Sequence, residues 1–590
     1  MTDRKGHRMH KKLLRLAFLF AFLAPFCGHA ENLAKFPGWK LQQPESKPAR
    51  LVADEKSDTL RIEISKATEP FYLIQVAQPV SQAVADGDLL RLSFRARSPT
   101  ANPLRAVVER SGPPYESVIE TRTTISPEWK DYSVSGESLQ AYAAGLLSLR
   151  IQCGQQTGVI EIASFRLENL GVSPAGEAAR AALDPDATEA RIKKYRTGDL
   201  RVEVRDANGK PVSGATVKIE MTRSAFLFGC NIFKLDPKNT EPWQIAYQSE
   251  FTNIFNYATL PFYWGSFEHE QGKPDYARLE KMAQWCRDHG VEPKGHPLVW
   301  HEAWPSWAPK DADAAIPLFH HRVSDLISHY RGLVSFWDVL NEANNAADFT
   351  QTGEGNWVKR DGPAAVVSTA LGWAREAVGT NRATLLYNDY NSGAENEKLI
   401  GELQKMNALP DAIGIQSHMH DHVWPLRRVW QTCERFGAFG RPLHFTELTV
   451  ISSTNRPKEF EAKRGEWPTT PDGEALQADY CEKLYTLLFS HPAVQAITWW
   501  DFSDRDAWRN APAGLIREDM TPKPAYEKLH TLIRKKWWTR ADGTSDSSGT
   551  FSTRAFHGDY RITATTPDGR RAEITARLSP GSDGNVEIKL

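Results

Sequence analysis

The feature that most constrains the fold is a regular alternation of two hydrophobic periods between residues 226 and 500. Short runs of β-branched and aromatic residues recur, and amphipathic stretches with helical spacing separate them. This alternation predicts an α/β fold with a parallel sheet of βα units. Eight βα units in about 310 residues have the size of a closed (β/α)8 TIM barrel. The eight predicted strands are Phe226–Cys230, Ile254–Ala258, Glu292–Val299, Val334–Leu340, Thr384–Asn388, Ala412–Gln416, Leu443–Thr446 and Ala496–Trp500.

Two glutamates follow the fourth and seventh predicted strands, Glu342 and Glu447. The active sites of such barrels form at the carboxyl ends of the strands. One protonated and one ionised carboxyl, facing each other across a sugar bond, are what glycoside hydrolysis requires. A glutamate at a strand end is ordinarily a surface residue, so position alone does not assign a role.

The motifs around these glutamates resemble glycoside hydrolase family 10, the retaining β-1,4-xylanases. Trp337–Ala343 is similar to the acid/base signature of that family, and His444–Leu448 to its nucleophile signature. The resemblance extends from about Phe226 to Tyr526, and a match of several motifs in one order is more specific than any single motif. The other motifs, in the order of the family, are Gly295–His301, Tyr387–Asn391, Gln416–His418, Trp499–Asp501 and Asp506–Arg509.

The resemblance implies a retaining endo-1,4-β-xylanase that needs no cofactor and no metal. It implies that Glu342 is the acid/base, Glu447 the nucleophile and Asn341 the hydrogen-bond donor to the sugar 2-hydroxyl. By the same resemblance His418 orients Glu447. Physically, Glu342 must keep its proton near neutral pH, which burial and the negative charge of Glu447 would favour. The resemblance also places five residues around the sugar next to the cleaved bond: His296, Trp300, Gln416, Trp500 and Trp508.

Three positions depart from the family pattern at the subsite that holds the sugar two units from the cleaved bond. Leu260 and Tyr263 stand where the family has Asn and Lys, and Ala303 stands where it has Gln. Each lost hydrogen bond would cost about 1 kcal/mol or more if nothing replaced it. Xylan is therefore the expected substrate by resemblance, and the same chemistry on a decorated xylan or another β-glycan is the alternative. A non-catalytic glycan-binding protein would predict loss of a glutamate, and both are present.

The N-terminus has the pattern of a secretory signal peptide over residues 1–30. Basic residues precede an apolar run from Leu16 to Phe26, and the small residues Gly28 and Ala30 lie three and one positions before the expected cut. A membrane anchor is the alternative, but the run is shorter than the ~20 residues that a span requires. The mature protein is expected outside the cytoplasm, either extracellular or periplasmic.

The rest of the chain divides into β-rich segments around the barrel. Residues 31–171 alternate like a β-sandwich, with strands such as Thr59–Ile64 and Phe71–Val76, and resemble jelly-roll carbohydrate-binding modules; a structural spacer is the equal alternative. Residues 172–197 are expected to form a linker with a helical turn or two. The other expected segments are a β-hairpin at 198–224, pairing with 545–590, a barrel domain at 225–540 and a C-terminal β segment at 541–590.

Composition excludes some partners and favours others. The formal net charge is −1, so no basic surplus indicates nucleic acid or an anionic membrane. The 19 tryptophans favour a carbohydrate site, because flat indole rings stack on sugar rings. The expected partner is a plant-type polysaccharide, and the expected state is a monomer.

His418, His420 and His422 are spaced as a metal site could be, but the expected chemistry needs no metal.

Overall fold

The computed structural model describes residues 32–33, 38–112, 115–455, 457 and 462–590. The chain forms two compact units, one ending at Ser173 and the other running from Pro174 to Leu590. The expected signal peptide, residues 1–30, lies outside the described residues. Within the described ranges, no helix has the length and apolar character needed to cross a membrane.

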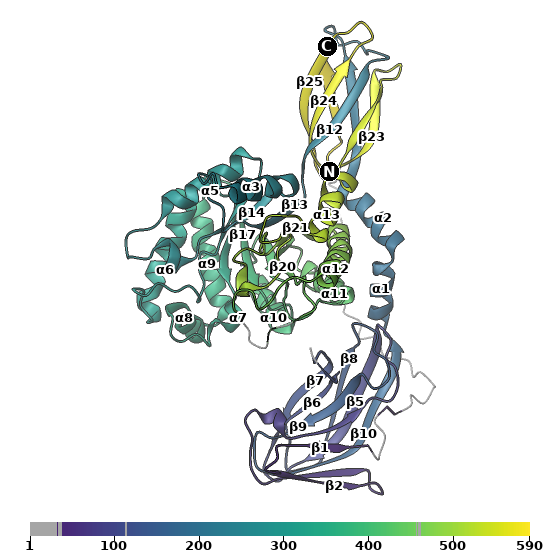
Figure 1. Cartoon of the computed structure of the whole chain (residues 1–590), viewed down its shortest axis with the longest axis vertical. Helices are drawn as coiled ribbons and strands as arrows, with labels where there is room; N and C mark the ends of the chain where they lie inside the picture. Colours follow the sequence, from purple (N-terminus) through teal and green to yellow (C-terminus); the bar gives the residue numbers. More distant parts are fainter. Residues whose placement is uncertain (1–31, 34–37, 113–114, 456, 458–461) are drawn as a thin grey trace, which may run out of the picture. The chain divides into compact units, whose positions relative to one another are not determined.

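The first unit is an antiparallel β-sandwich with its own hydrophobic core (Figure 1). Alternate residues of each strand face that core, as in the strand Asp88–Arg97, where Leu90, Leu92, Phe94 and Ala96 are buried. One sheet has the order β1 (Lys40–Gln42), β4 (Gln75–Pro79), β9 (Leu147–Gln152), β6 (Pro103–Arg110) and β7 (Ser117–Thr124). The other has the order β2 (Ala49–Asp54), β3 (Thr59–Ile64), β10 (Gly158–Val172), β5 (Asp88–Arg97) and β8 (Lys130–Glu137).

The predicted strand Phe71–Val76 is only partly a strand. Phe71–Leu73 forms a short 3-10 turn, η1, in which the Leu73 N–H donates to the Pro70 carbonyl at 3.2 Å. Pro70 fixes the backbone at the start of this turn, so the ladder begins only at Gln75. The prediction Thr59–Ile64 is confirmed as β3.

The second unit contains the predicted barrel of eight parallel strands. Pairing of β21 with β13 closes the circle, and all neighbouring pairs are parallel. In order around the barrel the strands are β13 (Leu227–Asn231), β14 (Tyr257–Pro261), β15 (Glu292–His296), β16 (Phe336–Asn341), β17 (Thr384–Asp389), β18 (Ala412–Ile415), β20 (Leu443–Val450) and β21 (Val494–Trp499). A two-residue strand, β19 (His418–Met419), adds to β20 at the carboxyl end.

Helices enclose these strands, as Figure 1 shows. Every residue of β14 and of β20 is buried, because one face looks into the barrel and the other lies under helices. The helices are α3 (Pro242–Ile254), α4 (Trp264–Phe267), α5 (Tyr276–Asp288), α6 (Ala312–His329), α7 (Ala343–Ala346), α8 (Gly353–Asp361), α9 (Pro363–Val378), α10 (Ala394–Lys405), α11 (Leu426–Gly437), α12 (Pro471–Ser490) and α13 (Pro524–Thr531).

Side-chain caps fix where several of these helices begin. Asp311 accepts from the Ala314 N–H at 3.0 Å, and Thr470 accepts from the Gly473 N–H at 3.2 Å. Each cap satisfies a backbone donor that the first helical turn leaves without an intrahelical partner.

The prediction of a strand beginning at Ile254 was wrong, because Ile254 is the last residue of α3 and β14 begins at Tyr257.

The segments on either side of the barrel form a small β unit with its own core. The expected hairpin at 198–224 is not present, because its two strands lie in different sheets. β11 (Thr197–Arg205) lies between β23 (Thr550–Phe556) and β26 (Asn585–Lys589). β12 (Thr216–Ser224) lies between β22 (Arg540–Thr544) and β24 (Gly558–Thr565), and β25 (Arg571–Leu578) completes that sheet.

The expected linker is more ordered than a helical turn or two. It contains α1 (Pro174–Leu183, 10 residues) and α2 (Pro185–Arg196, 12 residues). Asp184 caps α2 by accepting from two backbone N–H groups, and the proline that follows suits the first helical position.

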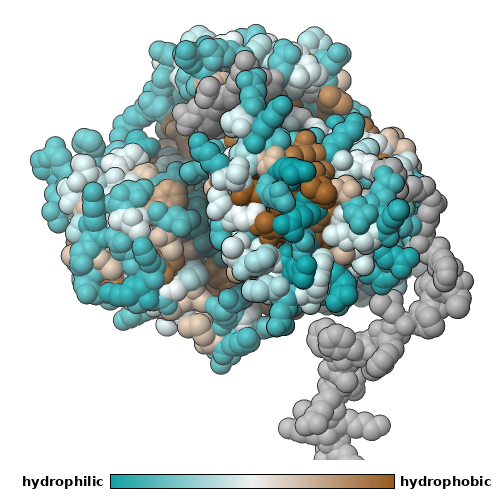
Figure 2. Space-filling model, turned by 90° about the horizontal axis from the view of Figure 1, so that it is seen from below, coloured by the Kyte–Doolittle hydropathy of each residue, from teal (hydrophilic) through white to brown (hydrophobic). Residues whose placement is uncertain are grey.

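On the face seen in Figure 2, hydrophilic side chains predominate and hydrophobic ones gather in small patches.

Candidate active site

The barrel brings the two glutamates to its carboxyl rim. Glu342 directly follows β16, the fourth barrel strand. Glu447 lies inside β20, the seventh strand, which runs on to Val450 rather than ending at Thr446 as predicted. Glu342 has a left-handed backbone, with φ 60° and ψ 47°, and is 8% exposed. Such backbone strain in a non-glycine residue is concentrated at functional sites.

A continuous hydrogen-bond network joins the two carboxyls. Gln416 Nε2 donates to Glu342 Oε1 at 2.7 Å and to Asn341 Oδ1 at 3.2 Å. Asn388 Nδ2 donates to the same Asn341 oxygen at 2.8 Å and to Glu447 Oε1 at 2.7 Å. Asn341 Nδ2 donates to Glu342 Oε1 at 3.1 Å, so its expected contact with a sugar 2-hydroxyl stays a prediction. Side chains from four strand ends thereby fix the two glutamates relative to each other.

The two carboxyls have opposite pKa shifts. Burial is the largest cause that raises the pKa of Glu342, and the negative charge of Glu447 adds to it; the resulting pKa is about 8. Burial would also raise the pKa of Glu447, but nearby His296 and the hydrogen bond from His418 outweigh it and hold this pKa below its ordinary value. Near neutral pH, Glu342 can therefore donate a proton while Glu447 is an anion.

His418 lies where its predicted orienting role requires. Its Nε2 is 3.1 Å from Glu447 Oε2, and its Nδ1 is 3.0 Å from the Thr449 hydroxyl oxygen. The Thr449 hydroxyl donates to the Glu447 backbone carbonyl at 3.2 Å, and His418 bridges this hydroxyl and the Glu447 carboxyl. These contacts hold the His418 ring beside the Glu447 carboxyl.

His296 belongs to a second set of buried, interacting side chains, which lies next to Glu447. Its Nδ1 is 2.8 Å from Asp338 Oδ2, and its Nε2 is 3.9 Å from Glu447 Oε1. Lys294 Nζ is 2.7 Å from the same Asp338 oxygen, and both side chains of this ion pair are fully buried. Lys294 and His296 outweigh the effect of burial and lower the pKa of Asp338. The fixed Asp338 carboxylate holds the His296 ring in place beside the nucleophile.

The predicted tryptophans lie around this polar centre. Trp300 Nε1 donates to Glu342 Oε2 at 3.2 Å. Trp500 is 5% exposed and packs edge-on against His296 and His418, with ring centroids 5.6 and 5.9 Å away. Trp508 is 42% exposed and lies 4.8 Å from the His418 ring. An exposed indole beside the nucleophile offers a face on which a sugar ring can stack.

The three departures from the family pattern have different surroundings. Leu260 is fully buried. Tyr263 packs against the rings of Trp300 and His296, with centroids 5.6 Å from each, and burial is the largest cause that raises its pKa far above the ordinary value. Its hydroxyl therefore stays protonated. Ala303 is exposed, and its carbonyl accepts from the Gly265 N–H at 2.7 Å.

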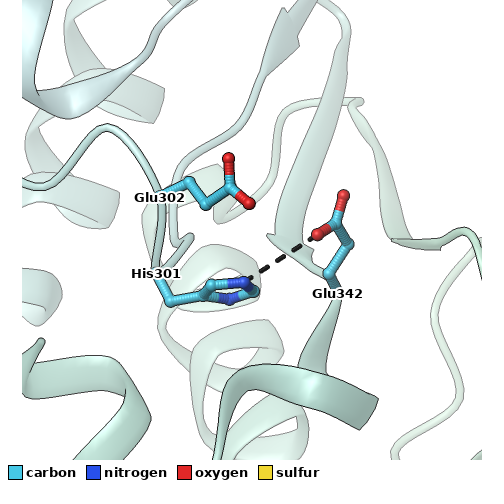
Figure 3. Close-up of side chains that lie close together, drawn as sticks. All are labelled: His301, Glu302 and Glu342. Atoms are coloured by element: carbon cyan, nitrogen blue, oxygen red, sulfur yellow. Dashed lines mark ion pairs between the residues drawn. The ribbon is translucent and has the colours of Figure 1, made fainter. Parts of the chain in front are cut away.

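A cluster of three potential ligands borders the acid/base residue. Figure 3 shows His301, Glu302 and Glu342 pointing toward one another, and their nearest ligand atoms all lie within 4.8 Å of one another. Burial lowers the pKa of His301 to about 4. Among the described residues, the ligand atoms of His418, His420 and His422 do not form such a cluster.

The sequence predicted which residues form the site better than it predicted what each of them contacts. Sequence reasoning assigned no role to Asn388, Lys294 or His301. All three lie inside or next to the quoted motifs Gly295–His301 and Tyr387–Asn391: Lys294 lies within β15, His301 in the loop after it, and Asn388 near the end of β17. Their partners come from other strands, so only the folded barrel shows what each one contacts.

Comparison with known proteins identifies the family of the barrel. The profile described as "Glycosyl hydrolase family 10" matches residues 220–532, more than half of the chain. Anti-sigma-I factor RsgI6 of Acetivibrio thermocellus is 28% identical over 408 residues, which cover 67% of this chain and 49% of the relative. Endo-1,4-beta-xylanase B of Thermotoga neapolitana is 27% identical over 288 residues, covering 46% of this chain and 78% of the relative.

This chain spans about half the length of the first of these relatives (49%). Among solved structures, xylanase 10B from Thermotoga petrophila RKU-1 in complex with xylobiose has a TM-score of 0.45 at 23% identity, covering 53% of this chain and 95% of that one. The profile match, together with the eight-stranded barrel and the two glutamates at its rim, shows that the chain belongs to glycosyl hydrolase family 10.

Proposed function

We propose that this protein is a retaining endo-1,4-β-xylanase that hydrolyses xylan by double displacement. The observation that carries the proposal is the opposite pKa shift of Glu342 and Glu447, two carboxyls held in one hydrogen-bond network at the rim of a family 10 barrel. A proton donor and an anionic nucleophile are the two groups that the reaction requires.

In the first step, an oxygen of Glu447 attacks the anomeric carbon of the sugar. The bond from that carbon to the glycosidic oxygen breaks, and Glu342 transfers its proton to the departing oxygen. Asn388 and His418 hold the two Glu447 oxygens at 2.7 and 3.1 Å, which aligns the carboxylate for attack. The product is a glycosyl ester on Glu447 and a shortened glycan.

In the second step, water hydrolyses the ester. The negative charge on Glu447 is gone in the intermediate, so the repulsion that raised the pKa of Glu342 falls and Glu342 acts as a base. Glu342 takes one proton from water, the water oxygen bonds to the anomeric carbon, and the ester bond to Glu447 breaks. Two inversions at one carbon retain its configuration.

Xylan is the proposed substrate because the relatives that share the barrel are named endo-1,4-beta-xylanases. The second candidate is a decorated xylan or another β-glycan. The observation that favours it is the aromatic Tyr263, packed on Trp300 where a charged, hydrogen-bonding side chain is expected. A half-buried phenol offers one hydroxyl and a ring face, so it recognises a sugar differently from an ammonium group.

The first experiment compares product release from xylan, arabinoxylan, glucuronoxylan, mixed-linkage glucan and cellulose, with the Glu447→Gln variant as the blank. Xylo-oligosaccharides from plain xylan would support the first candidate. Activity on only one decorated or different glycan would support the second. Product equal to the blank on all five substrates would contradict both.

The nucleophile is tested by chemical rescue. In Glu447→Gly, added azide should restore cleavage of an activated aryl β-glycoside and yield an α-glycosyl azide, because azide attacks from the face that Glu447 occupied. A β-configured azide would remove Glu447 from this role. The same experiment on Glu342→Gly should give a β-azide, since azide then attacks the anomeric carbon of the glycosyl ester in place of water, needs no base, and releases Glu447.

The changed subsite is tested by restoring the family residues. In Leu260→Asn/Tyr263→Lys, kcat/KM on plain xylan should rise if those side chains are the only obstacle, because two hydrogen-bonding groups return. The matched control is Tyr263→Phe, which removes only the phenol hydroxyl. An unchanged rate in the double variant would show that the surrounding loops have changed as well.

We also propose that the β-sandwich binds carbohydrate. The outer face of the sheet with β6 and β9 carries a row of linked polar side chains: Arg105 donates to Gln152 at 2.8 Å, and Gln152 to Gln75 at 3.2 Å. Arg105 and Gln152 border a cavity of about 470 Å³ that Phe71 and Arg122 also line. Planar polar groups beside an aromatic ring suit sugar hydroxyls and sugar faces.

The sandwich proposal is tested with the full chain carrying Glu447→Gln. Its migration in native gels containing soluble xylan should be retarded, and the further change Arg105→Ala should reduce the retardation. The matched control Arg61→Ala removes an exposed arginine from the opposite sheet. Equal retardation with and without Arg105 would contradict the sandwich site.

We further propose that the enzyme is exported and acts as a monomer on plant-type polysaccharide. The basic and apolar pattern of residues 1–30 supports export. Cell fractionation of the native host, with detection of the mature N-terminus, tests it. Recovery of the full-length chain in the cytoplasm would contradict export.

A further inference from the structure

The cluster beside the acid/base residue combines one imidazole with two carboxyls. His301 and Glu302 lie in the loop after β15, and Glu342 follows β16, so neighbouring strands supply the groups. His301 Nε2 is 3.9 Å from Glu342 Oε2, and the nearest ligand atoms of all three residues lie within 4.8 Å of one another. Figure 3 shows the edge of the His301 ring directed at the Glu342 carboxyl, with Glu302 on the same side.

His301 independently indicates a ligand. It is 1% exposed, and neither of its ring nitrogens has a hydrogen-bond partner in the part of the chain that the structure describes. Buried polar atoms almost always have a partner, and a histidine that lacks one for both nitrogens indicates a water molecule or an ion. The ring of Phe349 packs against His301 with centroids 4.0 Å apart, which holds the imidazole in this direction.

We propose that His301, Glu302 and Glu342 bind a divalent cation of the zinc class, and that the bound ion reversibly inhibits the enzyme. One imidazole nitrogen and two carboxylate oxygens form a ligand set that Zn²⁺ accepts, with water in the fourth position. Magnesium and calcium instead require six or more oxygen ligands, which this cluster does not offer.

The three side chains need to move together only slightly to bind one ion. A tetrahedral Zn²⁺ with bonds of about 2.0–2.2 Å holds its ligand atoms roughly 3.3–3.5 Å apart. The 3.9 Å between His301 and Glu342 is close to this separation. Glu302 is exposed, so its side chain can move to complete the site without disturbing the core.

Inhibition rests on the proposed role of Glu342, whereas binding of the ion does not. A cation that takes Glu342 Oε2 replaces the proton that the first step must deliver to the leaving oxygen. The ion is therefore an inhibitor and has no part in the chemistry, which needs no metal. Glu302 gives this family 10 barrel a way to respond to free zinc in its surroundings.

Binding is measured first, by calorimetric titration of the full chain with ZnCl2. We expect one site, whose dissociation constant rises at least tenfold in Glu302→Gln, because a neutral amide is a poor zinc ligand. The matched control Glu270→Gln removes another exposed glutamate and should bind like the wild type. Titration with MgCl2 should give no binding. Equal zinc affinity in wild type and Glu302→Gln would overturn the site, as would the absence of zinc binding to the wild type.

Inhibition is measured next, on the substrate that the wild type hydrolyses best. The zinc concentration that halves the rate should rise at least tenfold in Glu302→Gln, with each rate expressed relative to the same variant in EDTA. EDTA added after zinc should restore the wild-type rate. If the wild type hydrolyses no glycan, the proposed function fails while the calorimetry still decides the zinc site. If zinc binds without inhibiting, the inhibitory role is overturned.

Discussion

At the scale of single residues, the site gives two chemically identical side chains different protonation states. Glu342 is buried against Trp300 and within reach of a second negative charge, and both effects favour its neutral form. Glu447 is as deeply buried, but His296 and His418 favour its anion. The division of roles between the two glutamates therefore depends on what surrounds them.

This difference predicts the pH dependence of kcat/KM. Glu342 must be protonated, so activity should fall as pH rises through about 8. Glu447 must be ionised, and its lowered pKa places the acid limb below the ordinary glutamate value of 4.5. A soluble aryl β-xylobioside measured between pH 3 and 10 tests both limbs. A basic limb near pH 5 would show that burial does not hold the proton on Glu342.

The buried Lys294–Asp338 pair predicts an asymmetric effect on stability. Lys294→Met removes the positive charge 2.7 Å from Asp338 Oδ2 and leaves the fully buried Asp338 carboxylate with its hydrogen-bond contact to His296. Breaking such a pair costs about 3–5 kcal/mol in the free energy of unfolding. The double variant Lys294→Met/Asp338→Asn should recover part of this loss, because no charge is then left without its partner. Denaturant unfolding measures the free energy of unfolding of both variants, and equal values would refute this prediction.

At the scale of elements, the close approach of β17 and β18 positions Glu447, the proposed nucleophile. A Cβ added at Gly414 on β18 would lie 2.4 Å from Asn388 Oδ1 and 3.1 Å from the Asn388 Cα. The same Asn388 accepts from the Thr446 hydroxyl at 2.6 Å and donates to Glu447 at 2.7 Å. A glycine on one strand therefore makes room for the residue that orients the catalytic carboxylate of another.

We therefore expect Gly414→Ala to lower activity more than the small size of one added methyl group would suggest. The methyl group must displace Asn388 and with it the hydrogen bond to Glu447, so we expect kcat to fall roughly tenfold or more, which corresponds to at least about 1.4 kcal/mol. The matched control is Gly401→Ala in α10, where the nearest atom to a new Cβ is 4.0 Å away. That control should keep full activity and gain up to about 1 kcal/mol of stability. Steady-state kinetics with a circular-dichroism melt separates the two effects, and a fully active Gly414→Ala would contradict the role of this contact.

At the scale of the whole molecule, the sandwich, the barrel and the small β unit each have a hydrophobic core of their own, which predicts which segments are dispensable. The sandwich has its own core, and in the described residues none of its strands pairs with a strand beyond Ser173. The small β unit differs, because β11 and β12 precede the barrel in sequence while their partner strands follow it.

A chain starting at residue 174 should therefore fold and keep its kcat/KM on a soluble substrate. A chain ending at residue 540 should not, since β11 and β12 would lose the strands that cover their apolar faces and edges. Expression yield, thermal unfolding and hydrolysis of an aryl β-xylobioside compare the two truncations. A stable, monomeric chain ending at 540 would refute this division.

The elements that sequence reasoning missed share a physical cause. Ile254 was assigned to a strand, but its side chain is equally buried at the end of α3, and a short apolar run does not distinguish the two. The segment 198–224 was expected to be a hairpin because its strands are close in sequence. β11 and β12 do not pair with each other and instead take partners more than 300 residues away, which include strands of the segment 545–590 with which pairing was expected.

The amino-acid sequence by itself determined the barrel, its eight strands and the positions of Glu342 and Glu447, because hydrophobic period and strand-end position are local properties of the chain. Only the tertiary structure decided which side chains meet there. Asn388 joins Asn341 to Glu447, Lys294 is paired with Asp338, and His301 faces Glu342, each across a gap of more than 40 residues. These contacts and the burial of the carboxyls set the pKa values, and both arise only when the eight strands close into a barrel.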